Sequence, residues 1–136
     1  TEEKVYSEEV KTVQASSISE NINYDNKAMF ANATVYFEFD KSNLTSKSIQ
    51  TLKSAVNALN ENSSIKISLA GHADERGTRE YNLALGQRRA ETVADYFALN
   101  GINSSRITVK SYGEERPKEL GQNEESFAKN RRVEIN

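Results

Sequence analysis

The chain has 136 residues, of which 36% are hydrophobic, and its 18 Lys and Arg face 20 Asp and Glu for a net charge of −2. This length fits one domain, and the near-neutral balance argues against general nucleic-acid binding, which usually needs a basic surface. The chain has no cysteine, which excludes a disulfide, a thiolate zinc site and a cysteine nucleophile. The longest apolar runs are only a few residues long, so we expect no transmembrane helix.

The first 30 residues differ in composition from the rest of the chain. They carry a net charge of −3, which leaves +1 for the remainder, and their apolar residues are sparse among Ser, Asn and Glu. Such a segment buries too little apolar surface to offset the entropy of ordering it. We therefore predict a flexible acidic tail over residues 1–30 and one folded domain over residues 31–136.

The first half of the domain shows three regular segments. Apolar and polar residues alternate over residues 34–39, which predicts a half-buried strand. Thr45 can cap a helix whose apolar residues recur at helical spacing as far as Asn60. Alternation returns over Ile65–Ala70, which we predict to be the second strand.

The second helix is predicted to begin at Thr78 or Glu80 and to end at Asn100. Gly101 suits the left-handed conformation that often follows a helix. The third predicted strand, Ile107–Tyr112, again alternates apolar and polar residues.

The last part of the chain predicts a turn, a short helix and a short strand. Pro117 forbids a helix through the turn. Asn123 can cap a short helix, and Arg131–Ile135 reads as the final strand. The resulting order, β-α-β-α-β-(α)-β, predicts an α/β (α+β) sandwich with helices packed on one face of the sheet.

Catalytic arrangements are hard to assemble from these residues. His72 is the only histidine, so a metal set with Asp74 and Glu75 lacks a second imidazole, and a structural histidine at a strand end is the simpler interpretation. A Ser–His–Asp triad would need a GxSxG elbow, which is absent. The adjacent carboxylates Glu114 and Glu115 point apart on an extended segment, which argues against a glycosidase pair. No glycine-rich phosphate loop is present.

One acid and one base stand out. Asp74 follows the second predicted strand, and Arg89 lies on the helix that folds back over the sheet, so the two can approach each other. They can simply pair, or each can hold one end of a ligand that carries an ammonium and a carboxylate, since the arginine fork matches two carboxylate oxygens. Arg131 and Arg132 point to opposite faces of the last strand. Only one of them can reach the same site, and the other is predicted to be a solvated charge.

Four segments follow one another over about residues 34–136: VYFEFDKSNL, GHADERGTREYNLALGQRRAETVADYF, SYGEERP and NRRVEI. Together they resemble the OmpA-like peptidoglycan-binding family. They follow the family pattern GH[TA]D-x-x-G-x-x-x-x-N-x-x-L-[SG]-x-x-R-A. The variant GHADERGTREYNLALGQRRA, together with SYGEE, is similar to the branch of peptidoglycan-associated lipoproteins.

The resemblance implies a mixed four-stranded sheet and a non-catalytic module, without a cofactor, that binds the peptide stem of peptidoglycan. In the family, the loop Asp and the helix Arg grip the diaminopimelate residue of the stem, and they map onto Asp74 and Arg89. Phe39 could equally continue the core stripe of the first strand. The family's further contacts map onto Phe39, Asp40, Arg76, Gly77, Asn82, Leu83 and Arg132.

The same resemblance implies a setting. Proteins of this branch lie in the periplasm of Gram-negative bacteria and tether the outer membrane to the wall with the Tol system, whose protein TolB is a partner. Their anchor is a lipidated N-terminal Cys, which this chain does not contain. One alternative is the OmpA-like domain of an outer-membrane barrel or a flagellar-motor stator. The other, less favoured for lack of a nucleophile or metal set, is a peptidoglycan-acting enzyme with His72 as its base.

Overall fold

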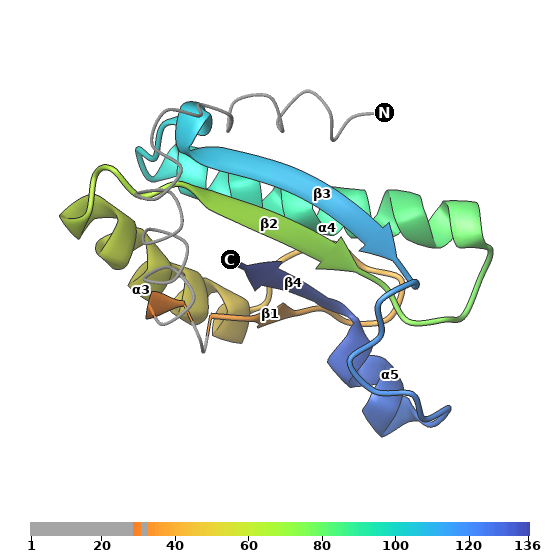
Figure 1. Ribbon diagram of the computed structural model, residues 1–136. Coiled ribbons are helices and arrows are strands. Elements are labelled where there is room, and N and C mark those ends of the chain that lie inside the picture. Colours follow the sequence, from red (N-terminus) through yellow and green to blue (C-terminus); the bar gives the residue numbers. More distant parts are fainter. Residues whose placement is uncertain (1–28, 31–32) are drawn as a thin grey trace.

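The computed structural model describes residues 29–30 and 33–136. The predicted acidic tail therefore lies outside the described residues, apart from Met29 and Phe30. The elements are β1 (Val35–Tyr36), α3 (Ser46–Glu61), β2 (Ile67–His72), α4 (Arg79–Leu99), the 3-10 helix η2 (Ser104–Arg106), β3 (Ile107–Gly113), α5 (Glu124–Asn130) and β4 (Arg132–Ile135) (Figure 1).

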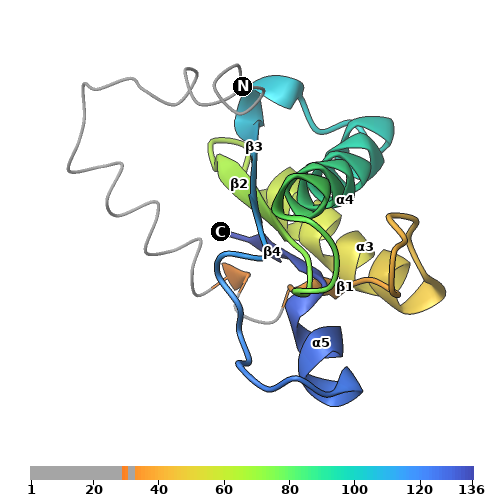
Figure 2. The same cartoon turned by 90° about the vertical axis from the view of Figure 1, so that its right-hand side faces the viewer.

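The strands form one mixed sheet in the order β1-β4-β2-β3. β4 runs antiparallel to both β1 and β2, and β2 runs parallel to β3. The parallel pair needs a crossover connection, which α4 supplies. Helices α3 and α4 cover one face of the sheet, while α5 lies beyond its end (Figure 2). This arrangement confirms the predicted fold class.

The hydrophobic core fills the space between the sheet and these two helices. Burial of each large apolar side chain contributes roughly 1.5–3 kcal/mol. Phe30, which lies just before the predicted domain, is also part of this core. The largest fully buried apolar side chains of the core are Val35, Leu52, Leu59, Leu69, Val93, Phe97, Val109 and Val133.

The helix ends follow local capping signals. The hydroxyl of Thr45 accepts the N–H of Ser48 at 3.1 Å, and that of Thr78 accepts the N–H of Tyr81 at 3.0 Å. These bonds satisfy donors that have no partner inside the helix. Gly101 follows α4 with φ of +87°, as its position predicted. Both long helices thus begin and end close to where the sequence indicates.

β1 is shorter than the alternation over residues 34–39 predicted. After Tyr36 the chain keeps one bond to the neighbouring segment, from the N–H of Phe37 to the carbonyl of Arg131 at 2.9 Å. It then turns at Asp40, whose φ is +59°. Phe39 is consequently 51% exposed, so the expectation that it could continue the core stripe is wrong.

β2 lies two residues further along the chain than predicted and passes through Gly71 close to α4. A Cβ at Gly71 would lie 1.9 Å from the carbonyl oxygen of Gly86 on α4. This pair of glycines therefore lets the helix backbone rest directly on the strand. Arg89, one turn beyond Gly86, is thereby held against the end of β2. In the part of the chain that the structure describes, no helix combines the length and hydropathy needed to cross a bilayer.

Candidate functional site

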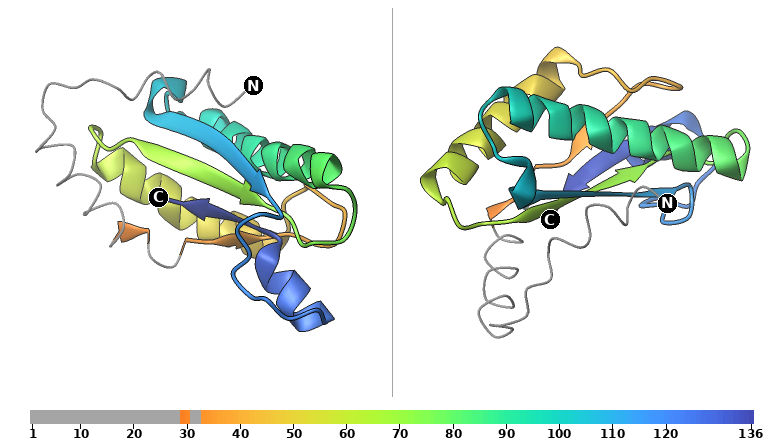
Figure 3. Two further views of the ribbon diagram at one scale, coloured as in Figure 1. Left: turned by 45° about the vertical axis from the view of Figure 1, so that its right-hand side comes forward. Right: turned by 90° about the horizontal axis from the view of Figure 1, so that it is seen from above.

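A pocket of about 300 Å³ opens at the end of the sheet where two loops meet. One loop joins β1 to α3, and the other joins β2 to α4; both lie at the same end of the molecule (Figure 3). The start of α4 forms the remaining wall. The lining residues are Phe39, Asp40, Ala73, Asp74, Arg76, Gly77, Tyr81, Asn82, Leu85 and Arg89.

Asp74 presents a buried and saturated carboxylate. Its Oδ1 accepts the backbone N–H and the Nε of Arg76, at 3.0 and 3.2 Å. Its Oδ2 accepts Nη2 of Arg76 at 2.9 Å and Nη1 of Arg131 at 3.3 Å. Burial alone raises the pKa of Asp74, but the bonds from Arg76 and then Arg131 outweigh it and hold this pKa below its usual value. The carboxylate is therefore charged although its side chain is only 3% exposed.

Arg76 covers Asp74 from the solvent side. Its guanidinium lies over the ring of Phe39 at 4.1 Å and over that of Phe127 at 4.5 Å. It also pairs with Glu124 of α5 at 3.4 Å. The side chain remains 37% exposed. Arg76 is thus a partly exposed cation at the mouth of the pocket.

Arg89 is fully buried, at 0% exposure, and it bonds to backbone carbonyls instead of to Asp74. Nε donates to Lys41 at 2.8 Å, Nη1 to His72 at 2.9 Å and Nη2 to Glu38 at 3.1 Å. These bonds use three of its five N–H donors. Burial and then the nearby Arg131 lower the pKa of Arg89 to about 10, so it stays charged at neutral pH. Its charge is therefore not neutralised by a directly bonded carboxylate.

The rim of the pocket is polar. The hydroxyl of Tyr81 donates to Oδ1 of Asp40, and this bond raises the pKa of Tyr81. Asn82 is 1% exposed and donates to Oε1 of Glu114 at 2.6 Å. Gly77 has φ of +108°, a conformation that side chains disfavour, so glycine suits this turn.

Most of the residues that the resemblance assigned to the site lie together in this pocket. Leu83 does not: it is 49% exposed and lines a separate hollow with Tyr112 and Gly113. Successive helical residues point about 100° apart around the helix axis. Because Asn82 points into the pocket, Leu83 points away from it. The assigned residues that line the pocket are Phe39, Asp40, Asp74, Arg76, Gly77, Asn82 and Arg89.

The resemblance assigned Arg132 to this site, but the structure contradicts that assignment. Arg131, and not Arg132, lies beside Asp74. Arg131 also donates Nε to the carbonyl of Phe37 at 2.8 Å. Arg132 lies on the opposite face of the sheet and pairs with Glu134 at 2.6 Å. The two do point apart as predicted, but both are buried, so neither is the solvated charge that was expected.

The sequence did hold a signal for this choice. Val133 and Ile135 are buried in the core on the helix-covered side. Side chains two apart along a strand share a face, so Arg131 lies on their side and Arg132 does not. Three further pocket residues, Ala73, Tyr81 and Leu85, were not predicted. Tyr81 could have been, because a helix that begins at Thr78 places it in the first turn, next to the loop that carries Asp74.

Comparisons with known proteins identify the family of the chain. Residues 36–131 match the model of the OmpA family. The peptidoglycan-associated lipoprotein of Pseudomonas aeruginosa is 45% identical over 111 residues, which are 82% of this chain and 66% of the relative. The chain thus spans just under two thirds of that relative's length.

Solved structures give the same result. The crystal structure of the peptidoglycan-associated lipoprotein from Burkholderia pseudomallei superposes with a TM-score of 0.75 at 39% identity, over 77% of this chain and 89% of that one. The C-terminal domain of Helicobacter pylori MotB, at 21% identity, has a TM-score of 0.69 over 75% of this chain and 81% of that one, which shows a shared fold alone. The chain therefore belongs to the OmpA family, and it is similar to peptidoglycan-associated lipoproteins within it.

Proposed function

We propose that this domain binds peptidoglycan without catalysis and holds the diaminopimelate residue of the peptide stem in the pocket of Asp74 and Arg89. One observation carries the proposal. A buried carboxylate and a buried guanidinium line the same pocket, yet no hydrogen bond joins them. A ligand with both an ammonium and a carboxylate complements such a pair. The names of the similar lipoproteins support the same ligand class.

In the proposed complex, the ammonium of the ligand replaces the guanidinium of Arg76 at Asp74. The ligand's carboxylate approaches the two N–H donors of Arg89 that the backbone leaves free, and its ammonium approaches Asp74. The oxygens of Asp74 are already occupied, so the side chain of Arg76 must leave them, while its backbone N–H and Arg131 stay. Because Arg76 is partly exposed, its departure is easier than that of Arg131. Such an exchange gives a modest net affinity for each stem.

An enzymatic function is less well supported. A hydrolytic role would place the ring of His72 beside Asp74 as a base. The ring instead lines the groove on the other face of the sheet, and only the backbone carbonyl of His72 contacts the pocket, through Arg89. The described residues also contain no cluster of His, Cys, Asp and Glu that could hold a metal.

We place the domain in the periplasm of a Gram-negative bacterium, where it links the outer membrane to the wall within the Tol system. Its partners would include TolB, and its anchor would be a lipidated cysteine. This setting rests on the similarity to the lipoproteins. Attachment to a barrel or to a motor stator would keep the same pocket. Co-purification of TolB with the domain from periplasmic extract is the expected result, and failure to recover TolB would favour one of the other attachments.

Co-sedimentation with purified wall sacculi tests the pocket. We expect binding to diaminopimelate-type sacculi and at least tenfold weaker binding to lysine-type sacculi, because lysine lacks the side-chain carboxylate that faces Arg89. We also expect Asp74→Asn to weaken binding at least tenfold, and Arg79→Gln, on the exposed side of α4, to leave it unchanged. Equal binding to both wall types would exclude the proposed ligand even if a variant failed to fold.

A further inference from the structure

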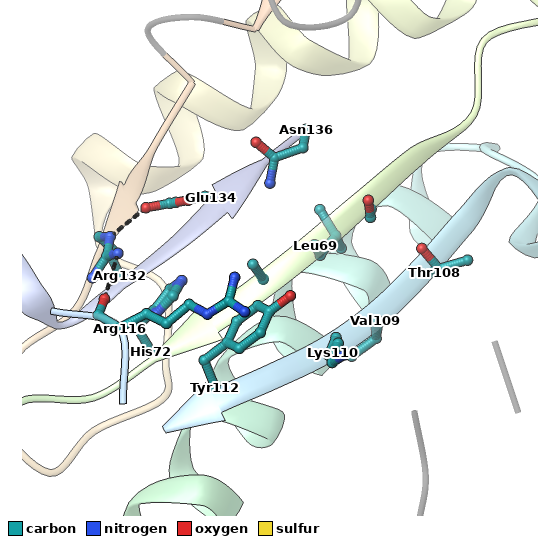
Figure 4. Close-up of a pocket in the computed structure, with 12 residues that line it drawn as sticks. Leu69, His72, Thr108, Val109, Lys110, Tyr112, Arg116, Arg132, Glu134 and Asn136 are labelled. Atoms are coloured by element: carbon teal, nitrogen blue, oxygen red, sulfur yellow. Dashed lines mark hydrogen bonds and ion pairs between the residues drawn. The ribbon is translucent and has the colours of Figure 1, made fainter. Parts of the chain in front are cut away.

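The face of the sheet opposite the two long helices carries a second, polar groove of about 500 Å³. Side chains from alternate positions of β2, β3 and β4 line it, together with Arg116 from the turn after β3 (Figure 4). The residues that matter are His72, Lys110, Tyr112, Arg116, Arg132 and Glu134. None of them lines the pocket of Asp74.

The groove has an excess of positive charge. It contains Lys110, Arg116 and Arg132 against the single acid Glu134. Arg132 is already engaged, with Glu134 at 2.6 Å and with the carbonyls of Asn130 and Arg116 at 3.2 and 3.1 Å.

The other two cations lie on an aromatic platform instead. The guanidinium of Arg116 lies 4.1 Å from the ring centre of Tyr112, and the ammonium of Lys110 lies 5.3 Å from it. Both side chains are exposed. Within residues 29–30 and 33–136, neither pairs with a carboxylate. One ring thus holds two cations close together, and no carboxylate of the described residues occupies them.

His72 points to a ligand independently of these charges. It is 2% exposed, and neither Nδ1 nor Nε2 has a hydrogen-bond partner among the described residues. Its ring stacks on Tyr112 at 5.5 Å. Burial, and then Arg132, lower its pKa to about 4, so the ring is neutral, with one donor and one acceptor nitrogen. A buried polar group without a hydrogen-bond partner is unfavourable, and a polar ligand in the groove would supply the missing partner.

We propose that this groove is a second binding site and that its ligand is the free carboxylate of a peptide. The planar fork of Arg116 matches the two oxygens of a carboxylate, Lys110 adds a second charge, and His72 offers an N–H donor at the groove wall. The groove touches the first site only through His72, whose ring lines the groove and whose carbonyl accepts Arg89. This inference does not depend on the proposed wall function.

The single histidine makes a direct test possible, because ring signals of His72 can be followed by NMR without ambiguity. The probes are N-acetyl-alanyl-alanine with a free carboxylate and the same dipeptide as its C-terminal amide. Neither carries the ammonium that the first pocket selects. We expect a saturable shift of the His72 signals with the acid and at least tenfold weaker binding of the amide. Equal responses to the two, or no saturable shift with the acid, would overturn the proposal.

Variants localise the effect. The double variant Lys110→Gln with Arg116→Gln should weaken binding of the acid at least tenfold. The double variant Lys47→Gln with Lys53→Gln, an equal loss of charge at two exposed positions of α3, should not change it. If inorganic phosphate at matched ionic strength shifts His72 with equal affinity, the groove is a general anion site and the peptide assignment is wrong. Asp74→Asn should lose wall binding but keep the His72 response, so failure at one site is distinguishable from failure at the other.

Discussion

At the scale of single residues, the pocket depends on how Asp74 keeps its charge while buried. Removing a carboxylate from water costs several kcal/mol unless partners replace the water. Arg76 and Arg131 are those partners, but they differ in exposure. Arg131 is enclosed, whereas Arg76 stands at the mouth. One arginine therefore stabilises the folded site, and the other occupies the position that the ligand's ammonium would take.

This difference predicts the effect of Arg76→Gln. Without the competing guanidinium, Asp74 is open to the ammonium, so we expect affinity for a diaminopimelate tripeptide to rise by about three- to tenfold, or roughly 1 kcal/mol. Calorimetric titration measures it, with Arg79→Gln as the control. The resemblance assigned Arg76 a direct ligand contact, which predicts the opposite sign, so a fall in affinity would restore that assignment.

His72 should make stability depend on pH. Its pKa lies at about 4 in the folded chain against 6.5 ordinarily. Between these values the unfolded chain binds the proton and the folded chain does not, so stability falls as the pH drops through this window. The loss amounts to about 3 kcal/mol once the pH is below 4.

The variant His72→Phe keeps a ring on Tyr112 and cannot titrate. Denaturant unfolding at several pH values should show a flatter profile between pH 6.5 and 4 than in the parent chain. At neutral pH the variant should be at least as stable as the parent, because it removes two buried ring nitrogens that have no hydrogen-bond partner in the described part of the chain. If both proteins gave the same pH slope, the ring of His72 would be solvated rather than buried.

At the scale of the elements, the contact between Gly71 and Gly86 sets the position of α4 and hence of Arg89. Gly71→Ala puts a methyl group into the helix backbone, which must shift. We expect a loss of about 3 kcal/mol or more in unfolding free energy, together with weaker wall binding. Gly101→Ala meets no atom within 4 Å and should lose only about 1 kcal/mol through its left-handed backbone. If both variants lost a similar amount of unfolding free energy, the close approach of Gly71 to Gly86 would not be what positions α4.

The elements also show what sequence could and could not predict. Thr45 and Asn123 were recognisable as caps because a cap bonds within three residues of itself. The length of β1 was not predictable from alternation, because distant arginines hold the carbonyls of Phe37 and Glu38 away from a sheet ladder. The choice between Arg131 and Arg132 depends on Val133, because the residue two positions before a core residue on a strand lies on the same face as that residue.

Patterns of residues along the chain could not predict which strands pair when those strands are far apart in sequence. β1 joins β4, with Val35 opposite Val133, and no local signal links residues so far apart. The mixed sheet and most of the pocket came from the family resemblance. Local chemistry alone selected Asp74 and Arg89 but left open whether they pair with each other. The structure shows that they do not, because Arg89 uses the backbone instead.

At the scale of the whole molecule, the modest affinity per stem that we propose would be compatible with firm attachment, because a wall presents many stems. Two copies of the domain joined by a flexible linker should be retained on sacculi at least tenfold better than one copy, since the second binding event becomes intramolecular. Wash-off from immobilised sacculi measures the retention. Asp74→Asn in one of the two copies should return retention to the single-copy level, and retention that survived this change would argue against multivalent stem binding.

The arginines of the pocket have a mechanical consequence. Arg89 holds the carbonyls of Glu38 and Lys41, and Arg131 holds that of Phe37, so the segment that leaves β1 is fastened at three points to the walls of the site. β1 itself is an edge strand with a two-residue ladder to β4. Tension applied on the N-terminal side of β1 would therefore be carried by the same guanidinium groups that shape the ligand pocket. A pull on that end of the domain would also strain the pocket in which we propose that a stem is held.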